Sequence, residues 1–343
     1  MTRKYKSLFV LLTLFIANII LFTGCGRKPE GHKDRVKQLN LAITAPGEEA
    51  VLFMQKLSEI YHERTHIPVS IETLLLEQTI SSMREKNSDI CFTSVNAATL
   101  AYWGRGRYEE TGASPLRLVF YTSYKPIYII VLRDSGIEGL ADLKGKRIMG
   151  LKHTDVGVEQ ATRGFIELAG LNQDDIVMHF LVPEPHALAC LEFKTADAVL
   201  IQTPLTSMTI RNATVLEKIK VIGVPAGKEE EIKSILGPGY DTLILNLDRL
   251  KESEAFTALI RRYAIYAREE VPEEIIYNFI KAYYENERVI LEPVSDQRTW
   301  DIKEYLTVLQ TVPFHDGAVR FLKEQGLWTE ELARQQEALL KES

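Results

Sequence analysis

Residues 133–170, RDSGIEGLADLKGKRIMGLKHTDVGVEQATRGFIELAG, decide the fold predicted for this chain of 343 residues. Turn residues at the start and at 144–146 enclose a short helical piece, and the apolar run 148–151 then predicts a β-strand. Residues 153–155 offer N-caps for a helix that Gly170 ends. The order strand, polar loop, helix start is typical of an open α/β sheet, which binds ligands at the carboxyl edge of its strands.

The helix start after residue 155 favours an anionic ligand. The first turn of a helix presents unpaired backbone N–H groups and the positive end of the helix dipole. Four residues of this loop and turn are therefore candidates for ligand binding: Lys152, His153, Thr154 and Gly157.

The same order of elements recurs along the chain. Strands are predicted at 39–44, 69–71, 88–93 and 198–201, and helices at 48–65 and 75–85. Residues 94–104 are predicted to be a polar loop that leads into a helix ending at Gly104. The polar or small residues that follow these strands complete the candidate site: Thr44, Pro46, Gly47, Thr73, Ser94, Asn96, Gln202 and Thr203. Taken singly, each of these residues also fits an ordinary cap or turn, so the prediction depends on their common placement.

The remaining elements predict a two-lobed α/β protein, in which each lobe has a mixed, mostly parallel sheet flanked by helices. Strands at 116–122 and 126–132 would pass between the lobes, and one at 242–247 would return. The C-terminal region is predicted to be helical, at 255–267, 273–284, 303–309 and 317–325. Lobe 1 is expected to comprise residues 39–128 and 225–343, and lobe 2 residues 129–224.

The N-terminal segment has the pattern of an export signal. Basic residues precede an apolar run, and Gly24-Cys25 follows it. The cysteine context resembles a bacterial lipobox, so residues 1–24 are expected to be a lipoprotein signal peptide, Cys25 the lipidated residue and 25–38 a tether. The alternative is an uncleaved membrane anchor, but the apolar run is shorter than the roughly 20 residues that span a bilayer. Both interpretations place the rest of the chain outside the cytoplasm.

The net charge and the cysteine content exclude some partners and some covalent links. The formal net charge of −6 and the lack of clustered Lys and Arg exclude nucleic acid as a partner. Cys91 and Cys190 fall in apolar stretches of different lobes. A disulfide is chemically possible outside the cytoplasm, but it would lock two lobes that must move, so free thiols are expected.

The segment 133–148 resembles the opening of the second lobe in type II periplasmic binding proteins. Several blocks together also resemble the TAXI family of solute-binding proteins, which serve TRAP transporters. These blocks are T-A-P-G-E-E at 44–49, N-A-A-T-L-A-Y-W-G-R-G-R-Y at 96–108, residues 134–148, and P-F-H-D-G-A-V-R-F-L-K-E-Q-G-L-W at 313–328. The resemblance implies capture of a small carboxylate and delivery to TRAP membrane subunits. It implies a binding protein, expected to be a monomer, without enzymatic turnover, cofactor or metal.

The departures from the TAXI pattern fall at binding loops, so they leave the solute and the importer open. Residues 72–76, ETLLL, stand where the family has glycine and serine, and Glu48 replaces a glycine. Another importer or a sensor is the alternative partner. A helix terminus stabilises an anion by roughly 0.3–2 kcal/mol, whereas micromolar binding needs about 8 kcal/mol. A cation should therefore contribute, and the candidates are Arg105, Arg107, Lys125 and Lys152.

An HExxH motif at His62, Glu63 and His66 is the one pattern that favours an enzyme. On a helix this spacing would let two imidazoles hold zinc, with the glutamate as general base. Pro68 disfavours helical geometry just before it, so His66 is expected at the fraying helix end, away from the carboxyl edge of the strands. A zinc hydrolase thus remains only an alternative.

Overall fold

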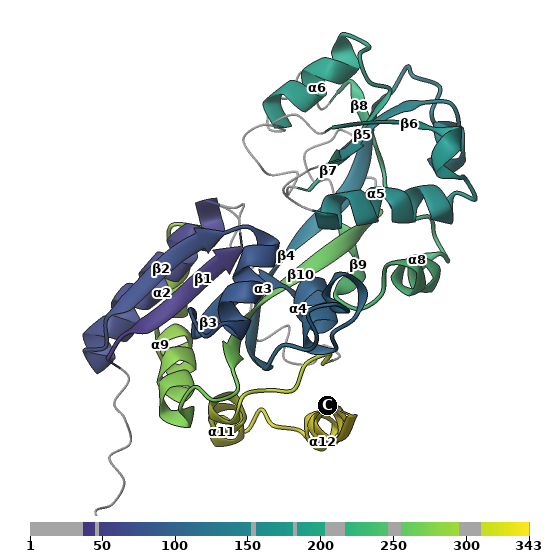
Figure 1. Ribbon diagram of the computed structural model, residues 1–343. Helices are drawn as coiled ribbons and strands as arrows, with labels where there is room; N and C mark the ends of the chain where they lie inside the picture. Colours follow the sequence, from purple (N-terminus) through teal and green to yellow (C-terminus); the bar gives the residue numbers. More distant parts are fainter. Residues whose placement is uncertain are drawn as a thin grey trace, which may run out of the picture. The chain divides into compact units, whose positions relative to one another are not determined.

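The computed structural model describes residues 37–44, 48–151, 156–180, 184–202, 217–245, 255–294 and 310–342 (Figure 1). Its first elements are β1 (Leu39–Thr44), α2 (Glu48–Thr65), β2 (Val69–Leu74), α3 (Leu76–Arg84), β3 (Ile90–Ser94), α4 (Val95–Tyr102) and β4 (Leu116–Leu132). Then follow β5 (Arg147–Leu151), α5 (Val156–Leu168), β6 (Val177–Phe180), α6 (Glu184–Glu192), β7 (Ala198–Ile201) and β8 (Ile219–Ile222). The last are α8 (Glu229–Leu236), β9 (Tyr240–Leu245), β10 (Phe256–Arg268), α9 (Glu273–Leu291), α11 (Asp316–Glu324) and α12 (Glu330–Glu342).

The strands form one mixed sheet in the order β2-β1-β3-β10-β4-β7-β5-β6, with β8 beside β4 and β9 beside β10. In its first part, β1 pairs in parallel with β2 and β3. In its second part, β5 pairs in parallel with β6 and β7. Parallel strands need crossover helices, which α2, α3, α5 and α6 supply. The sequence-based prediction of mixed, mostly parallel α/β structure is confirmed.

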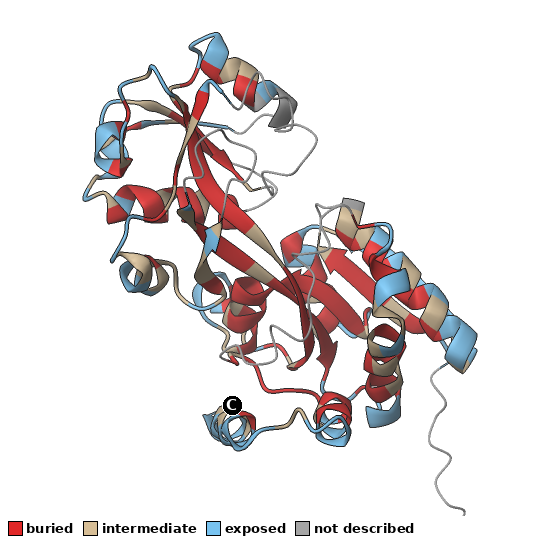
Figure 2. Cartoon of the chain, turned by 180° about the vertical axis from the view of Figure 1, so that it is seen from behind, coloured by how far each residue is buried: buried red, intermediate tan, exposed pale blue. Residues whose placement is uncertain are grey.

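Two long antiparallel strands, β4 and β10, join the two parts of the sheet. β10 pairs with β3 in the first part, and the end of β4 pairs with β7 and β8 in the second. The separate strands expected at 116–122 and 126–132 are one strand, which continues through Pro126. Figure 2 shows that both strands are buried along most of their length.

The predicted helix at 255–267 is wrong, because this segment forms β10. Burial explains the error. From Ala258 to Ile265, every residue except Arg262 is buried, so the sequence lacks the alternation that marks a half-exposed strand. A continuous apolar run of this kind is compatible with a buried helix as well as with a buried strand.

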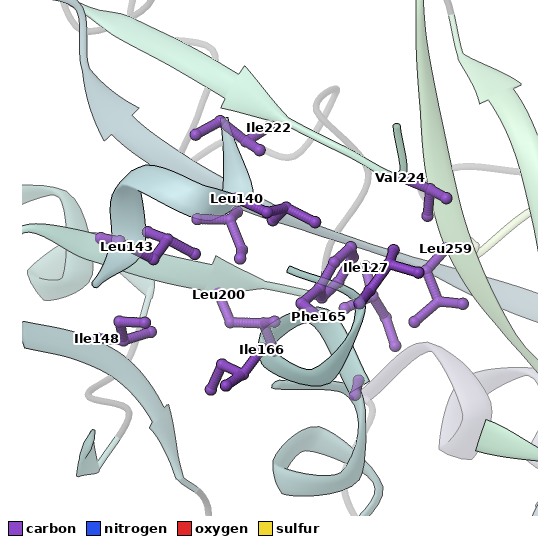
Figure 3. Close-up of a cluster of buried hydrophobic side chains, with 14 of the residues drawn as sticks. Ile127, Leu140, Leu143, Ile148, Phe165, Ile166, Leu200, Ile222, Val224 and Leu259 are labelled. Carbon is purple, nitrogen blue, oxygen red and sulfur yellow. The ribbon is translucent and has the colours of Figure 1, made fainter. Parts of the chain in front are cut away.

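A hydrophobic cluster fixes α5 on one face of the sheet (Figure 3). Phe165 of α5 packs with Leu200 of β7, Ile127 of β4 and Leu259 of β10, all of which are buried. The first turn of α5 is therefore held over the same face of the long strands.

The block at 313–328 has a structural role at the C-terminus. His315 is buried before α11, its Nδ1 accepts a hydrogen bond from the Gly317 N–H (3.1 Å), and its Nε2 donates to the Val271 carbonyl (2.9 Å). Burial lowers the pKa of His315 below its usual 6.5, in keeping with this neutral state. A Cβ on Gly317 would lie 2.4 Å from the Glu273 carbonyl oxygen, so glycine allows α11 to cross α9 closely.

The predicted signal peptide, Cys25 and most of the predicted tether lie outside the described residues. None of the helices that are described is both long and apolar enough to cross a membrane.

Candidate functional site

The carboxyl ends of β1 and β3 lie side by side, as their parallel pairing requires. Thr44 ends β1, and its Oγ1 donates a hydrogen bond to Oγ1 of Thr93 in β3 (3.0 Å). Thr73, one residue before the end of β2, is exposed. Pro46 and Gly47 lie outside the described residues. The structure thus brings Thr44 to the end of β3 and leaves Thr73 on the surface.

Ser94 is the junction between β3 and α4 and stands at the N-cap of that helix. A serine at this position ordinarily accepts a hydrogen bond from a backbone N–H of the first turn. The buried Ser94 side chain makes no such bond, and its Oγ instead accepts a hydrogen bond from Nη2 of Arg261 (3.1 Å). The hydroxyl therefore holds a cation at the start of α4.

Asn96, in the first turn of α4, holds a neighbouring loop. Its Nδ2 donates to the carbonyl oxygen of Pro238 (3.3 Å). The next residue, Gly239, has φ of 92°, and a Cβ there would lie only 2.3 Å from the backbone nitrogen of Asn96. Only glycine permits this approach, so the loop lies directly against the first turn of α4.

Gly157, in the first turn of α5, lies against the same arginine. A Cβ on Gly157 would be 2.3 Å from Cζ of Arg261. The Gly157 carbonyl oxygen accepts a hydrogen bond from the Tyr240 hydroxyl (3.1 Å), which fixes the start of α5 on β9. Arg261 therefore contacts the starts of both α4 and α5. Three further candidates on this loop, Lys152, His153 and Thr154, lie outside the described residues.

Lys125 lies beside Arg261 on the sheet. Arg261 of β10 pairs with Lys125 of β4 on one side and with Tyr240 of β9 on the other. Residues directly opposite one another in antiparallel strands share a face. Nζ of Lys125 is 5.6 Å and Cζ of Arg261 5.4 Å from the ring centroid of Tyr263, which stacks on Phe92 at 5.7 Å. Two cations thus lie against one fixed aromatic ring.

Gln202 directly follows β7, whose last residue, Ile201, pairs with Tyr128 of β4. Strand alternation is expected to place Gln202 on the face of Leu200, which is the face that α5 covers. Within the part of the chain that the structure describes, Nε2 of Gln202 is buried and has no hydrogen-bond partner. Thr203 lies outside that part.

The other predicted cations lie elsewhere. Arg107 forms an ion pair with Glu77 (2.5 Å), and the guanidinium of Arg105 lies over the Trp103 ring at 5.3 Å. Of the predicted cations that the structure describes, Lys125 lies beside Arg261.

Arg261 and Tyr240 were missed by sequence reasoning. The sequence predicts a helix at 255–267, which contains Arg261, and a strand that begins at residue 242, after Tyr240. If residues 256–268 were recognised as a buried strand, Arg261 would become a candidate site residue, because charged side chains are rarely fully buried.

The HExxH residues do not form a metal centre. α2 ends at Thr65, and His66 follows with φ of 58°, outside the helix as predicted. His62, Glu63 and His66 are exposed, and Nδ1 of His62 lies 3.0 Å from the Ile67 carbonyl oxygen. Among the described residues, no three His, Cys, Asp or Glu side chains gather closely enough to hold a metal ion.

Both remaining cysteines are free, as expected. Cys91 is fully buried, and burial raises the pKa of its thiol to about 12. Cys190 is half-buried. The Cys91 thiol is therefore protonated at neutral pH and behaves as a small apolar side chain.

Comparison with known proteins identifies both a family and a fold. Residues 57–326 match the NMT1-like family. XAC2383 from Xanthomonas citri, solved bound to ATP, is 12% identical with a TM-score of 0.50, and the match covers 89% of this chain and 98% of that one. The binding protein component of an ABC phosphonate transporter (PA3383) from Pseudomonas aeruginosa has the same identity, TM-score and coverage. The fold is that of a two-lobed periplasmic binding protein.

Proposed function

Because this chain belongs to the NMT1-like family and has the fold of a periplasmic binding protein, we propose that it is an extracytoplasmic solute-binding protein. It captures a small anionic solute of the carboxylate type between two lobes and releases that solute unchanged to a transporter in the membrane. One observation carries the proposal: Arg261 contacts Ser94 at the start of α4 and Gly157 at the start of α5.

That convergence supports solute capture for an electrostatic reason. Ser94 is the N-cap of α4 and Gly157 lies in the first turn of α5, so Arg261 lies at the positive ends of two helix dipoles from different parts of the fold. A buried cation between two such ends makes the potential at this place positive, which favours an anion.

The lobes of the proposal are residues 39–128 with 225–343, and residues 129–224. The pairing of β4 supports this division, because its first part pairs with β10 and its end with β7 and β8. β4 and β10 are then the connections about which the lobes close over the solute.

Cys25 is proposed as the site of lipidation after removal of residues 1–24. The lipid would hold the protein at the outer side of the membrane from which it is exported. Radiolabelled palmitate should label the wild-type chain and fail to label Cys25→Ser.

The proposed partner is a TRAP-type transporter, on the resemblance of the blocks at 96–108 and 313–328 to TAXI proteins. The alternative partner is an ABC-type importer or a sensor. Of these two, the fold likeness to a component of an ABC phosphonate transporter favours the importer. Cross-linking in native membranes discriminates, because TRAP subunits lack the ATPase that an ABC importer carries.

Native mass spectrometry of the purified protein, followed by a thermal-shift screen of organic acids, tests the function. A solute that binds the native state raises the melting temperature as its concentration rises. We expect saturable stabilisation by at least one acid and its recovery unchanged after incubation. A protein that retains no small molecule and responds to none, or that converts its ligand, would contradict the proposal.

A further inference from the structure

We propose that Arg261 and Lys125 together bind the acidic group of the solute, and that the Gln202 amide donates a further hydrogen bond to it. This inference rests on the proposed function and deepens it, because it assigns the residues that recognise the anion.

The burial of Arg261 is the first argument. Only 4% of its surface is exposed, so the guanidinium is held among protein groups. Its position is fixed by Ser94 Oγ at 3.1 Å, by Gly157 and by the Tyr263 ring at 5.4 Å. A buried, rigidly held guanidinium is pre-organised, so it loses little conformational freedom when it binds an anion.

The placement of Lys125 is the second argument. Its register opposite Arg261 and its approach to the same Tyr263 ring bring two positive charges to one face of the sheet. An anion that lies close to two neighbouring cations is attracted by both charges. The planar fork of arginine matches the two oxygens of a carboxylate, while the ammonium group of lysine supplies a point charge.

Gln202 supplies an independent observation from another strand. Its Nε2 is buried and, among the described residues, lacks an acceptor. A buried amide N–H without a partner costs about 1–3 kcal/mol, which an oxygen of a bound solute would recover. An acidic group with several acceptor oxygens therefore satisfies donors from β10, β4 and the end of β7.

The experiment measures binding of four probes to the purified full chain by isothermal titration calorimetry: succinate, L-glutamate, methylphosphonate and ethanesulfonate. Arg261→Gln, Arg261→Lys and Lys125→Gln are compared with Arg262→Gln. The control removes the same charge one residue along β10, where Arg262 pairs with Asp241 at 2.9 Å. Circular dichroism and the melting temperature report whether each variant is folded.

We expect the wild type to bind a carboxylate probe, and Arg261→Gln and Lys125→Gln each to weaken it about tenfold to a hundredfold. Arg261→Lys should recover part of that loss, and Arg262→Gln should change affinity less than threefold. If Arg261→Gln does not fold, Arg261→Lys and Lys125→Gln decide the question.

Three outcomes would overturn the inference. In the first, Lys125→Gln and the Arg261 variants bind the wild-type ligand unchanged, which leaves the proposed function standing. In the second, the wild type binds methylphosphonate or ethanesulfonate but no carboxylate, which removes the assigned ligand class. In the third, the wild type binds no small solute at all, and the proposed function fails with the inference.

Discussion

Replacing Gly157 by alanine should displace the Arg261 guanidinium while leaving α5 folded. The new Cβ would lie 2.3 Å from Cζ, 2.4 Å from Nη1 and 2.7 Å from Nη2 of Arg261. Carbon atoms in contact stand about 3.5–4 Å apart, so the guanidinium must retreat by about 1 Å or more. That shift breaks its hydrogen bond to Ser94, which is now 3.1 Å long.

The expected change in stability is small, because two effects oppose each other. Alanine in a helix is favoured over glycine by about 0.5–1 kcal/mol. Loss of a hydrogen bond from a charged group costs about 1.5–3 kcal/mol. The clashing atoms are the end of a long side chain that can move, so the net loss should not exceed about 2 kcal/mol. Anion binding should weaken at least about tenfold, since Arg261 no longer lies where the solute meets it.

Urea denaturation measures the stability and calorimetry the affinity. Gly164→Ala is the matched control in the same helix: its Cβ would lie 2.7 Å from Leu236 Cδ2, so it should cost stability by overpacking and leave affinity unchanged. In a double-mutant cycle, Gly157→Ala should have no effect on binding once Arg261 is already Gln. Equal losses of affinity from Gly157→Ala in both backgrounds would refute the reasoning.

Three further predictions concern parts of the fold away from Arg261. Because the pKa of His315 is held below its usual 6.5, its contribution to stability is full above about pH 6.5 and is lost as the pH falls through the lowered pKa. Denaturation between about pH 5 and 8 should show this slope in the wild type and a flatter one in His315→Gln. Equal slopes would show that another group titrates. Gly317→Ala should lower the free energy of unfolding by about 1–3 kcal/mol, because its Cβ would meet the Glu273 carbonyl, a backbone atom that cannot swing aside; an unchanged urea midpoint would disprove the close crossing of α11 and α9. With a pKa of about 12 and full burial, the Cys91 thiol should react with a disulfide reagent only after unfolding, and rapid labelling of the native protein would contradict this.

Much of the first part of the sheet follows from local sequence signals. Leu39–Thr44 and Glu48–Thr65 form the strand and helix predicted there, because an apolar run is followed by turn residues and then by helical periodicity. α2 ends at Thr65, shortly before Pro68, which disfavours helical geometry at the residue before it. Such signals depend on a few neighbouring residues, so the elements can be predicted without knowledge of the tertiary structure.

The strand that builds the site has no such signal, because its conformation is imposed from both faces. β10 lies between β3 and β4, and residues of α4 and α3 pack against it. Ala258, Ile260 and Ile265 are all buried, so apolar residues appear on both sides of the strand and hide its period of two. Tertiary burial therefore decided this element, and local propensity did not.

The same burial makes Arg261 informative. In a strand whose two faces are apolar, the guanidinium of Arg261 is only 4% exposed, and the Ser94 hydroxyl accepts its hydrogen bond instead of capping α4. Gly157 must also lack a side chain for the arginine to fit against α5. Two positions from separate elements, Ser94 and Gly157, are thus adjusted around one charge. The proposed recognition of an anion accounts for this arrangement, because it uses a positive charge held where the starts of α4 and α5 meet it.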